Sequence, residues 1–150
     1  MMHQQSVLRV VSKLLIPLIM LFALYVQFHG DFGPGGGFQA GVIFAAAFIL
    51  YGLIFGVATA RRVAPPHVTR LLLAAGVLLY AGVGVAGLLM GGNFLNYSVL
   101  AEKPLIGQHL GILLIELGVG ITVAAAMITI FFTFAGQDEL GDDDDAPEGN

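Results

Sequence analysis

The stretch Phe32–Ala60, FGPGGGFQAGVIFAAAFILYGLIFGVATA, contains no charged side chain, and it is bounded by Asp31 on one side and Arg61 on the other. A helix needs about 20 predominantly apolar residues to cross the hydrocarbon core of a bilayer. The part that follows the glycine-rich beginning of this stretch is long enough. The stretch therefore predicts a membrane-spanning helix over residues 38–60, preceded by a glycine-rich loop.

Three further stretches are equally poor in charge. Leu14–Phe28 and Leu71–Ala101 carry no charged side chain, and Leu105–Gln137 carries one carboxylate, Glu116. Together the four stretches predict helices near residues 8–28, 38–60, 69–91 and 108–134. A membrane β-barrel would show alternating apolar and polar residues over segments of about ten residues, and this alternation is not visible. The predicted fold class is an all-α membrane protein with four transmembrane helices and a glycine-rich loop between the first two.

The composition supports a membrane protein and excludes several other classes. Of the 150 residues, 57% are hydrophobic and only 11% are charged, whereas soluble domains carry roughly a quarter charged residues. Cysteine is absent, so disulfides and thiolate metal sites are excluded. No histidine pair has the spacing of a zinc site, and no basic patch suggests a nucleic-acid partner. We expect no metal site and no cofactor.

The distribution of charge predicts the orientation and a separate tail. Cytoplasmic loops carry an excess of Lys and Arg, and only Lys103 lies on the other side of the membrane from the remaining basic residues. Those five are Arg9, Lys13, Arg61, Arg62 and Arg70. Both termini are therefore predicted to be cytoplasmic. Residues 1–135 form the expected four-helix domain, and residues 136–150, which hold seven of the ten acidic residues, are expected to be a disordered acidic tail.

Pairs of glycines four residues apart predict close packing between helices. Small residues at this spacing allow two helix backbones to approach, which matters in lipid because the hydrophobic effect does not drive helices together there. Glycine-rich membrane helices contain some such pairs by chance, so the prediction concerns the helices collectively. The pairs are Gly37/Gly41, Gly52/Gly56, Gly87/Gly91 and Gly107/Gly111.

Glu116 is the leading candidate for ion or proton chemistry. It lies in an apolar run about a third of the way along the last predicted helix, where an ionised carboxylate is costly unless it is paired, protonated or facing water. Such a group can bind and release a proton or coordinate Na⁺. A protonated Glu116 could instead hold two helices together by a hydrogen bond. His109, two helical turns earlier on the same face, could relay protons to Glu116 or simply lie at the membrane interface.

The loop before the second helix has an unusual sequence, His29-Gly30-Asp31-Phe32-Gly33-Pro34-Gly35-Gly36-Gly37-Phe38-Gln39-Ala40-Gly41. Its glycines and proline exclude a helix over Gly33–Gly37. Backbone N–H groups at the start of the following helix would favour a negative charge, supplied by Asp31 or by a carboxylate of a partner protein. The loop could be a plain outer hairpin, but its glycine content favours a close backbone approach by another subunit.

This loop resembles the characteristic motif of the MnhB/MrpB-like family, whose members are small subunits of Mrp-type multisubunit Na⁺/H⁺ antiporters. The resemblance rests on His29, Asp31, Pro34, Gly35, Gly36, Gly37, Phe38 and Gly41, together with the segment Glu116-Leu117-Gly118-Val119-Gly120, and it covers about residues 5–135. Members of this family often have histidine where Asp31 stands, so the resemblance gives Asp31 no proton-carrying role. The acidic tail is not part of the family pattern.

The resemblance implies an accessory subunit of a complex in the bacterial inner membrane that exports Na⁺ in exchange for H⁺. Such a chain is a secondary transporter subunit and not an enzyme, its partners are the other Mrp-type subunits and the lipid bilayer, and Na⁺ and H⁺ are its transported ions. Glu116 and His109 are then the candidates for an ion or proton path. Two alternatives remain: a purely structural subunit of a complex I-like or hydrogenase-like assembly, and a small transporter that works alone.

Overall fold

The structure of the protein is a computed structural model that describes residues 2–30, 35–100 and 104–141; side chains are described for residues 6–30, 35–100 and 105–136. Asp31, Pro34 and Lys103 lie outside the described residues. The described part contains helices and no strand. The elements are α1 (Met2–His29), α2 (Gly37–Phe55), α3 (Val57–Val63), α4 (Pro66–Leu89), the 3₁₀ turn η1 (Tyr97–Val99) and α5 (Pro104–Gly141).

Four of the helices are long and apolar enough to cross a membrane. Their spans all have a mean hydropathy of at least 2.1, and they are Ser6–His29, Gly37–Phe55, Pro66–Leu89 and Leu105–Gly136. The prediction of an all-α protein with four membrane-spanning helices is confirmed. Pro17 lies within α1 without ending it.

The helix ends differ from the predicted ones by several residues in places, and two differences have a clear physical reason. The helix predicted over residues 38–60 is interrupted at Gly56, where a φ of 95° and a ψ of 145° separate α2 from α3. Glycine alone adopts such a conformation readily, and an apolar stretch does not reveal it. The last helix, predicted to end near residue 134, continues to Gly141. Backbone hydrogen bonding can continue into polar sequence, whereas the prediction followed only the apolar stretch.

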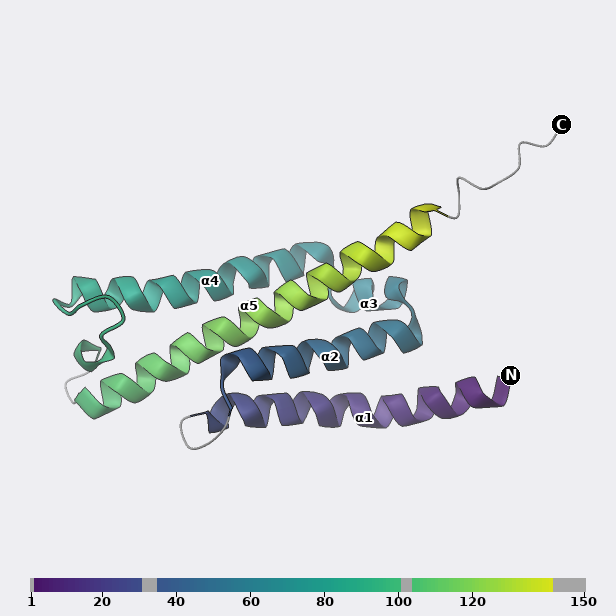
Figure 1. Ribbon diagram of the computed structural model, residues 1–150, viewed down its shortest axis with the longest axis horizontal. Helices are drawn as coiled ribbons and strands as arrows, with labels where there is room; N and C mark the ends of the chain where they lie inside the picture. Colours follow the sequence, from purple (N-terminus) through teal and green to yellow (C-terminus); the bar gives the residue numbers. More distant parts are fainter. Residues whose placement is uncertain (1, 31–34, 101–103, 142–150) are drawn as a thin grey trace.

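The helices form a row in the order α1, α2, α5, α4 (Figure 1), and extensive contacts join α1 to α2, α2 to α5 and α5 to α4. Helix α5 crosses diagonally between α2 and α4. The beginning of α1, the short helix α3 and the end of α5 lie at one end of the row, and the described residues next to the α1–α2 loop lie toward the other. The outer helices α1 and α4 are thus covered on one side only.

The core is built largely from small residues, because the helix backbones lie close together. Ala45 and Ala60 are fully buried and pack with Phe48, Ile128 and Phe132. The rings of Phe48 and Phe132 meet edge to face, with 6.0 Å between centroids and 84° between planes, an arrangement that aromatic pairs prefer. This cluster joins α2, α3 and α5. Large apolar side chains point outward instead, for example Leu14 and Leu78, as expected of helices that face lipid.

Glycines on α5 and its neighbours make the closest helix contacts. A β-carbon at Gly41 of α2 would lie 2.6 Å from the backbone oxygen of Gly120, and one at Gly76 of α4 would lie 2.8 Å from that of Gly118. Such distances leave no room for a side chain. Of the predicted pairs, Gly37/Gly41 lies wholly at such a helix contact, with α5, whereas the close approach of Gly76 to Gly118 was not predicted.

Candidate functional site: a carboxylate at the start of a helix

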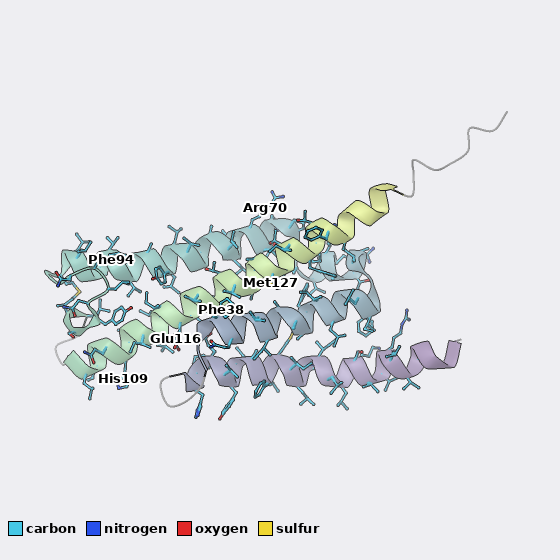
Figure 2. All side chains as sticks on the ribbon, in the orientation of Figure 1. Phe38, Arg70, Phe94, His109, Glu116 and Met127 are labelled. Atoms are coloured by element: carbon cyan, nitrogen blue, oxygen red, sulfur yellow. The ribbon has the colours of Figure 1, made fainter. Side chains whose placement is uncertain are left out.

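The carboxylate of Glu116 lies against the residues that end α1 and begin α2. A β-carbon at Gly30 would lie 2.8 and 2.9 Å from its two oxygens, and one at Gly36 would lie 3.3 Å from Oε1. Glycine at both positions therefore makes the space in which the carboxylate sits. Figure 2 shows Glu116 on α5 beside Phe38 in the first turn of α2. The two sequence features singled out above, the glycine-rich segment and the single acid of the apolar stretch Leu105–Gln137, thus form one site.

The backbone of α5 also touches the first residue of α2. A β-carbon at Gly37 would overlap the backbone carbonyl group of Glu116. Gly36 and Gly37 are both buried, and Gly36 has a φ of 132°, a conformation that favours glycine. The sequence favoured a close backbone approach by another subunit at this segment, and within the chain the backbone of α5 makes such an approach. Among the described residues, the Glu116 carboxylate of the same chain lies at the beginning of α2.

The location of the carboxylate has an electrostatic consequence. The first N–H groups of a helix have no acceptor within the helix, and the N-terminus of a helix carries a partial positive charge that stabilises an anion. At the beginning of α2, a backbone hydrogen bond runs from the N–H of Ala40 to the carbonyl of Gly36, at 3.0 Å. Glu116 is partly exposed. A carboxylate in this position can carry its charge at a much lower cost than one surrounded by apolar side chains.

The other predicted residues are arranged around this site at different distances. His29 stacks its ring on that of Tyr25, with 5.0 Å between centroids, and Tyr25 belongs to the exposed side of α1. Gly35 lies close to the end of α1, since a β-carbon there would be 2.9 Å from the backbone oxygen of Val26. Phe38 is 61% exposed. Gly41 contacts α5 one turn of α2 further on.

His109 does not join the carboxylate. Seven residues separate it from Glu116, which is a rise of about 10 Å along a helix, and its side chain is exposed near the beginning of α5. Figure 2 shows it beyond the beginning of α2. Its place is compatible with an outer step toward Glu116, but the structure does not bring the two side chains together.

One polar residue near the site was missed by sequence reasoning. Gln27 of α1 is only 5% exposed, and a β-carbon at Gly120 would lie 2.5 Å from its Oε1. The prediction searched for charged residues, and Gln27 carries no charge. The available signal was an amide side chain within the largely apolar second half of α1.

The connection between α4 and α5 lies at the end of the row away from α3. Phe94 fills the space over Gly84, and the ring of Tyr97 packs on Gly111. Partial burial of Tyr97, with a smaller contribution from Tyr80, raises the pKa of its phenol above the ordinary value. The phenol is thus neutral at physiological pH. Among the described residues, no group of three or more His, Cys, Asp or Glu side chains could hold a metal ion.

These features define a multi-pass helical membrane protein with a carboxylate held at the beginning of a helix, and comparison with known proteins gives its family. A family model described as "Domain related to MnhB subunit of Na+/H+ antiporter" matches residues 7–129. The chain therefore belongs to the MnhB family of antiporter subunits. This confirms the resemblance to the MnhB/MrpB-like subunits of Mrp-type antiporters.

Individual relatives agree with the family model over nearly the whole chain. The chain is 34% identical over 139 residues to "Putative antiporter subunit mnhB2" of Staphylococcus aureus strain Newman, covering 91% of this chain and 98% of the relative. The same identity and coverage hold for the protein of that name from Staphylococcus haemolyticus. Both relatives are named as antiporter subunits.

Proposed function

We propose that this protein is an accessory membrane subunit of a multisubunit Na⁺/H⁺ antiporter, and that Glu116 contributes to the path of the proton or ion. The observation that carries the proposal is the contact between the Glu116 carboxylate and Gly30, Gly36 and the beginning of α2. Two places in the chain, Gly30 after α1 and Gly36 before α2, lack a side chain next to this one titratable group. The membership in the MnhB family supports the same conclusion.

The electrostatics of the site favour proton transfer over direct binding of Na⁺ by this carboxylate. The beginning of α2 stabilises the anionic form of Glu116, so the group can release a proton. The same partial positive charge opposes a cation placed beside it. Partial exposure of Glu116 leaves a route by which a proton can arrive, and His109, about two turns along α5, is our candidate for the group that passes it on.

The proposed setting is a bacterial inner membrane with both termini in the cytoplasm. The described basic residues of α1, α3 and α4 lie toward the end of the row that holds α3, which supports this orientation through the positive-inside rule. The proposed partners are the other subunits of the antiporter and the lipid bilayer. The outer faces of α1 and α4, rich in exposed apolar side chains, are available to both.

The test is Glu116→Gln, which keeps the shape of the side chain and removes its charge and its proton exchange. If Glu116 is on the path, the complex should assemble normally and Na⁺/H⁺ exchange in membrane vesicles should fall at least tenfold. Glu116→Asp, which keeps a titratable carboxyl group, should retain part of the activity. Co-purification of the subunits measures assembly separately from exchange.

A structural role for Glu116 is the second candidate, and the same contacts favour it. A carboxylate that caps α2 would hold the α1–α2 connection against α5 without moving any ion. In that case Glu116→Gln would leave exchange unchanged, or would reduce assembly and exchange to the same extent. A self-sufficient transporter is a third possibility, and it predicts exchange by the purified chain reconstituted alone.

A further inference from the structure

Gln39 is a polar residue in the first turn of α2 that the proposed function does not use. Gly36 is the N-cap residue of this helix and Gly37 is its first residue, so Gln39 occupies the third helical position. A glutamine at this position can bend back over the start of its helix toward the N-cap backbone. The Oε1 of Gln39 does lie there, 3.4 Å from the point where a β-carbon of Gly36 would be. The amide is therefore folded toward the site.

The Glu116 carboxylate borders the same point from the side of α5. Its Oε1 is 3.3 Å from the position of that β-carbon, so the amide and the carboxylate share the space that Gly36 leaves open. Because the two distances have one end point in common, the two oxygens cannot be further apart than the sum of these distances. The amide nitrogen belongs to the same planar group as the amide oxygen, and an N–H···O bond spans about 2.9 Å. A direct hydrogen bond between the two side chains fits this separation without any movement of a helix.

The two groups are also chemically complementary. An ionised carboxylate only accepts hydrogen bonds, and a glutamine amide carries two N–H donors beside its oxygen. With the oxygen of Gln39 directed at the N-cap residue, the donors are left for the carboxylate. A hydrogen bond to an ionised group is shorter and stronger than one between neutral groups. It would fix the direction of the carboxylate, which the partial charge at the beginning of α2 does not do by itself.

We propose that Gln39 is a positioning residue for Glu116: its side-chain amide, folded back over Gly36, donates a hydrogen bond directly to the carboxylate. The proposal rests on the proposed role of Glu116 and deepens it. Gln39 is exposed and Glu116 is partly exposed, so the amide lies on the open side of the carboxylate. It holds the carboxylate in the orientation in which a proton reaches it, and it remains a donor to the carbonyl oxygen once Glu116 is protonated.

Few other titratable side chains among the described residues are placed to influence this pair. His29 is on α1 and stacks on Tyr25, Tyr80 is on α4 at the other side of α5, and His109 is two turns away on α5. Helix α2 has no charged residue, and its single tyrosine, Tyr51, lies in its last turns. A charge introduced at position 39 would therefore act on the carboxylate with little competition.

The experiment is infrared difference spectroscopy on the purified antiporter complex in lipid, with protonation changed by pH. The carboxyl C=O band that Glu116→Gln removes belongs to Glu116. Gln39→Met keeps the length of the side chain and removes both donors. In this variant the Glu116 band should shift to higher frequency, because the carbonyl oxygen loses its hydrogen bond, and Na⁺/H⁺ exchange in vesicles should fall about tenfold.

Gln39→Glu separates this role from that of a helix cap. Glutamate at the third helical position caps a helix as glutamine does and suits the positive end of α2, so a residue that only caps the helix would tolerate the change. If Gln39 donates to Glu116, the variant replaces the donor by a second acid. The Glu116 band should then move, and exchange should fall about tenfold or more. Each Gln39 variant is compared with its own Glu116→Gln counterpart, which identifies the Glu116 band.

Gln108 provides the matched controls, because it is an exposed amide on the same helix as Glu116. It precedes Glu116 by eight residues, a rise of about 12 Å. Gln108→Met and Gln108→Glu make the same two chemical changes away from the site. Both should leave the Glu116 band in place and exchange unchanged.

The outcomes separate this proposal from the proposed function. An unmoved Glu116 band in Gln39→Glu, equal shifts in the Gln108 variants, or a spectrum without a Glu116 band overturns the role of Gln39. Unchanged exchange in Glu116→Gln overturns the proposed function, while the band still reports whether amide and carboxylate are coupled. If Gln39→Met does not accumulate as an assembled complex, Gln39→Glu decides by the same criterion, because it preserves the cap.

Discussion

At the scale of single residues, the site depends on glycines, which have no side chain. Glu116 can lie against α1 and α2 only because Gly30, Gly36 and Gly37 have no β-carbon. The three glycines play different roles. Gly30 leaves space for the flexible end of the carboxylate, Gly36 adopts a positive φ, and Gly37 allows the backbones of two helices to touch. A clash with a side chain can be relieved by rotation, whereas a clash with backbone requires a helix to move.

The sharpest consequence concerns Gly37. In Gly37→Ala the added methyl group would meet the backbone carbonyl of Glu116, and we expect the protein to lose about 1–3 kcal/mol of stability, the usual cost of overpacking. Gly82→Ala is the matched control, because a β-carbon at Gly82 of α4 would have nothing within 4 Å. Alanine is a better helix former than glycine, so this variant should be as stable as the parent or more so. Thermal unfolding of the two variants in the same lipid or detergent measures the difference, and equal loss in both would contradict the packing argument.

At the scale of elements, α5 organises the molecule. It contacts α2 and α4 along much of its length and reaches α1 and α3 at its two halves. Near its end, Arg61 of α3 donates from Nη2 to the backbone oxygen of Phe132 at 2.9 Å, and its guanidinium lies 5.7 Å from the centre of the Phe132 ring. A planar group that hydrogen-bonds and stacks at once anchors α3 on α5.

Replacement of Arg61 by lysine should destabilise the contact between α3 and α5. Arg61→Lys keeps the positive charge but loses the planar group that bonds and stacks, and a hydrogen bond from a charged donor is worth about 1.5–3 kcal/mol. We expect a loss of about 1–2 kcal/mol in stability. Arg62→Lys, at an exposed neighbouring position, should have no effect. Thermal unfolding of both variants tests the prediction, and an unaffected Arg61→Lys would show that the charge alone holds α3 in place.

At the scale of the whole molecule, the row of four helices leaves two broad apolar faces. Neither α1 nor α4 is covered on its outer side within the described chain, and side chains such as Leu14, Leu78 and Leu89 are more than 60% exposed there. In water such faces would aggregate. In a membrane they can contact lipid or neighbouring subunits. The row also places α3 and the α4–α5 connection at opposite ends (Figure 1), so the two ends face opposite sides of the membrane.

The orientation can be tested directly, because the chain has no cysteine. His67→Cys places an exposed thiol at the beginning of α4, and Asn93→Cys places one in the α4–α5 connection. If the positive-inside rule holds for this chain, a membrane-impermeant maleimide should label intact cells only at position 93. Position 67 should react only after the membrane is opened. The reverse pattern would place both termini outside.

The membrane environment, the four spans and the family could all be predicted from the amino-acid sequence. Each of them follows from local properties: an uncharged stretch of about 20 residues must cross or avoid the membrane as a unit, and the motif around Pro34–Gly41 is contiguous in the chain. Glu116 could also be recognised from the sequence, because a single carboxylate in an apolar stretch can be identified without knowing its neighbours in space.

The surroundings of Glu116, by contrast, are known only from the packing of the helices. The meeting of α5 with Gly30 and Gly37 depends on which helices are neighbours, and in the row observed α5 lies next to α2 although two helices separate them in the chain. Helices that are apolar on all sides carry little periodic information about their neighbours, so sequence reasoning could not choose this pairing. For the same reason Gln27 was overlooked, because its significance comes from being enclosed opposite Gly120. The break at Gly56 is of the same kind, since glycine permits a positive φ but does not require one.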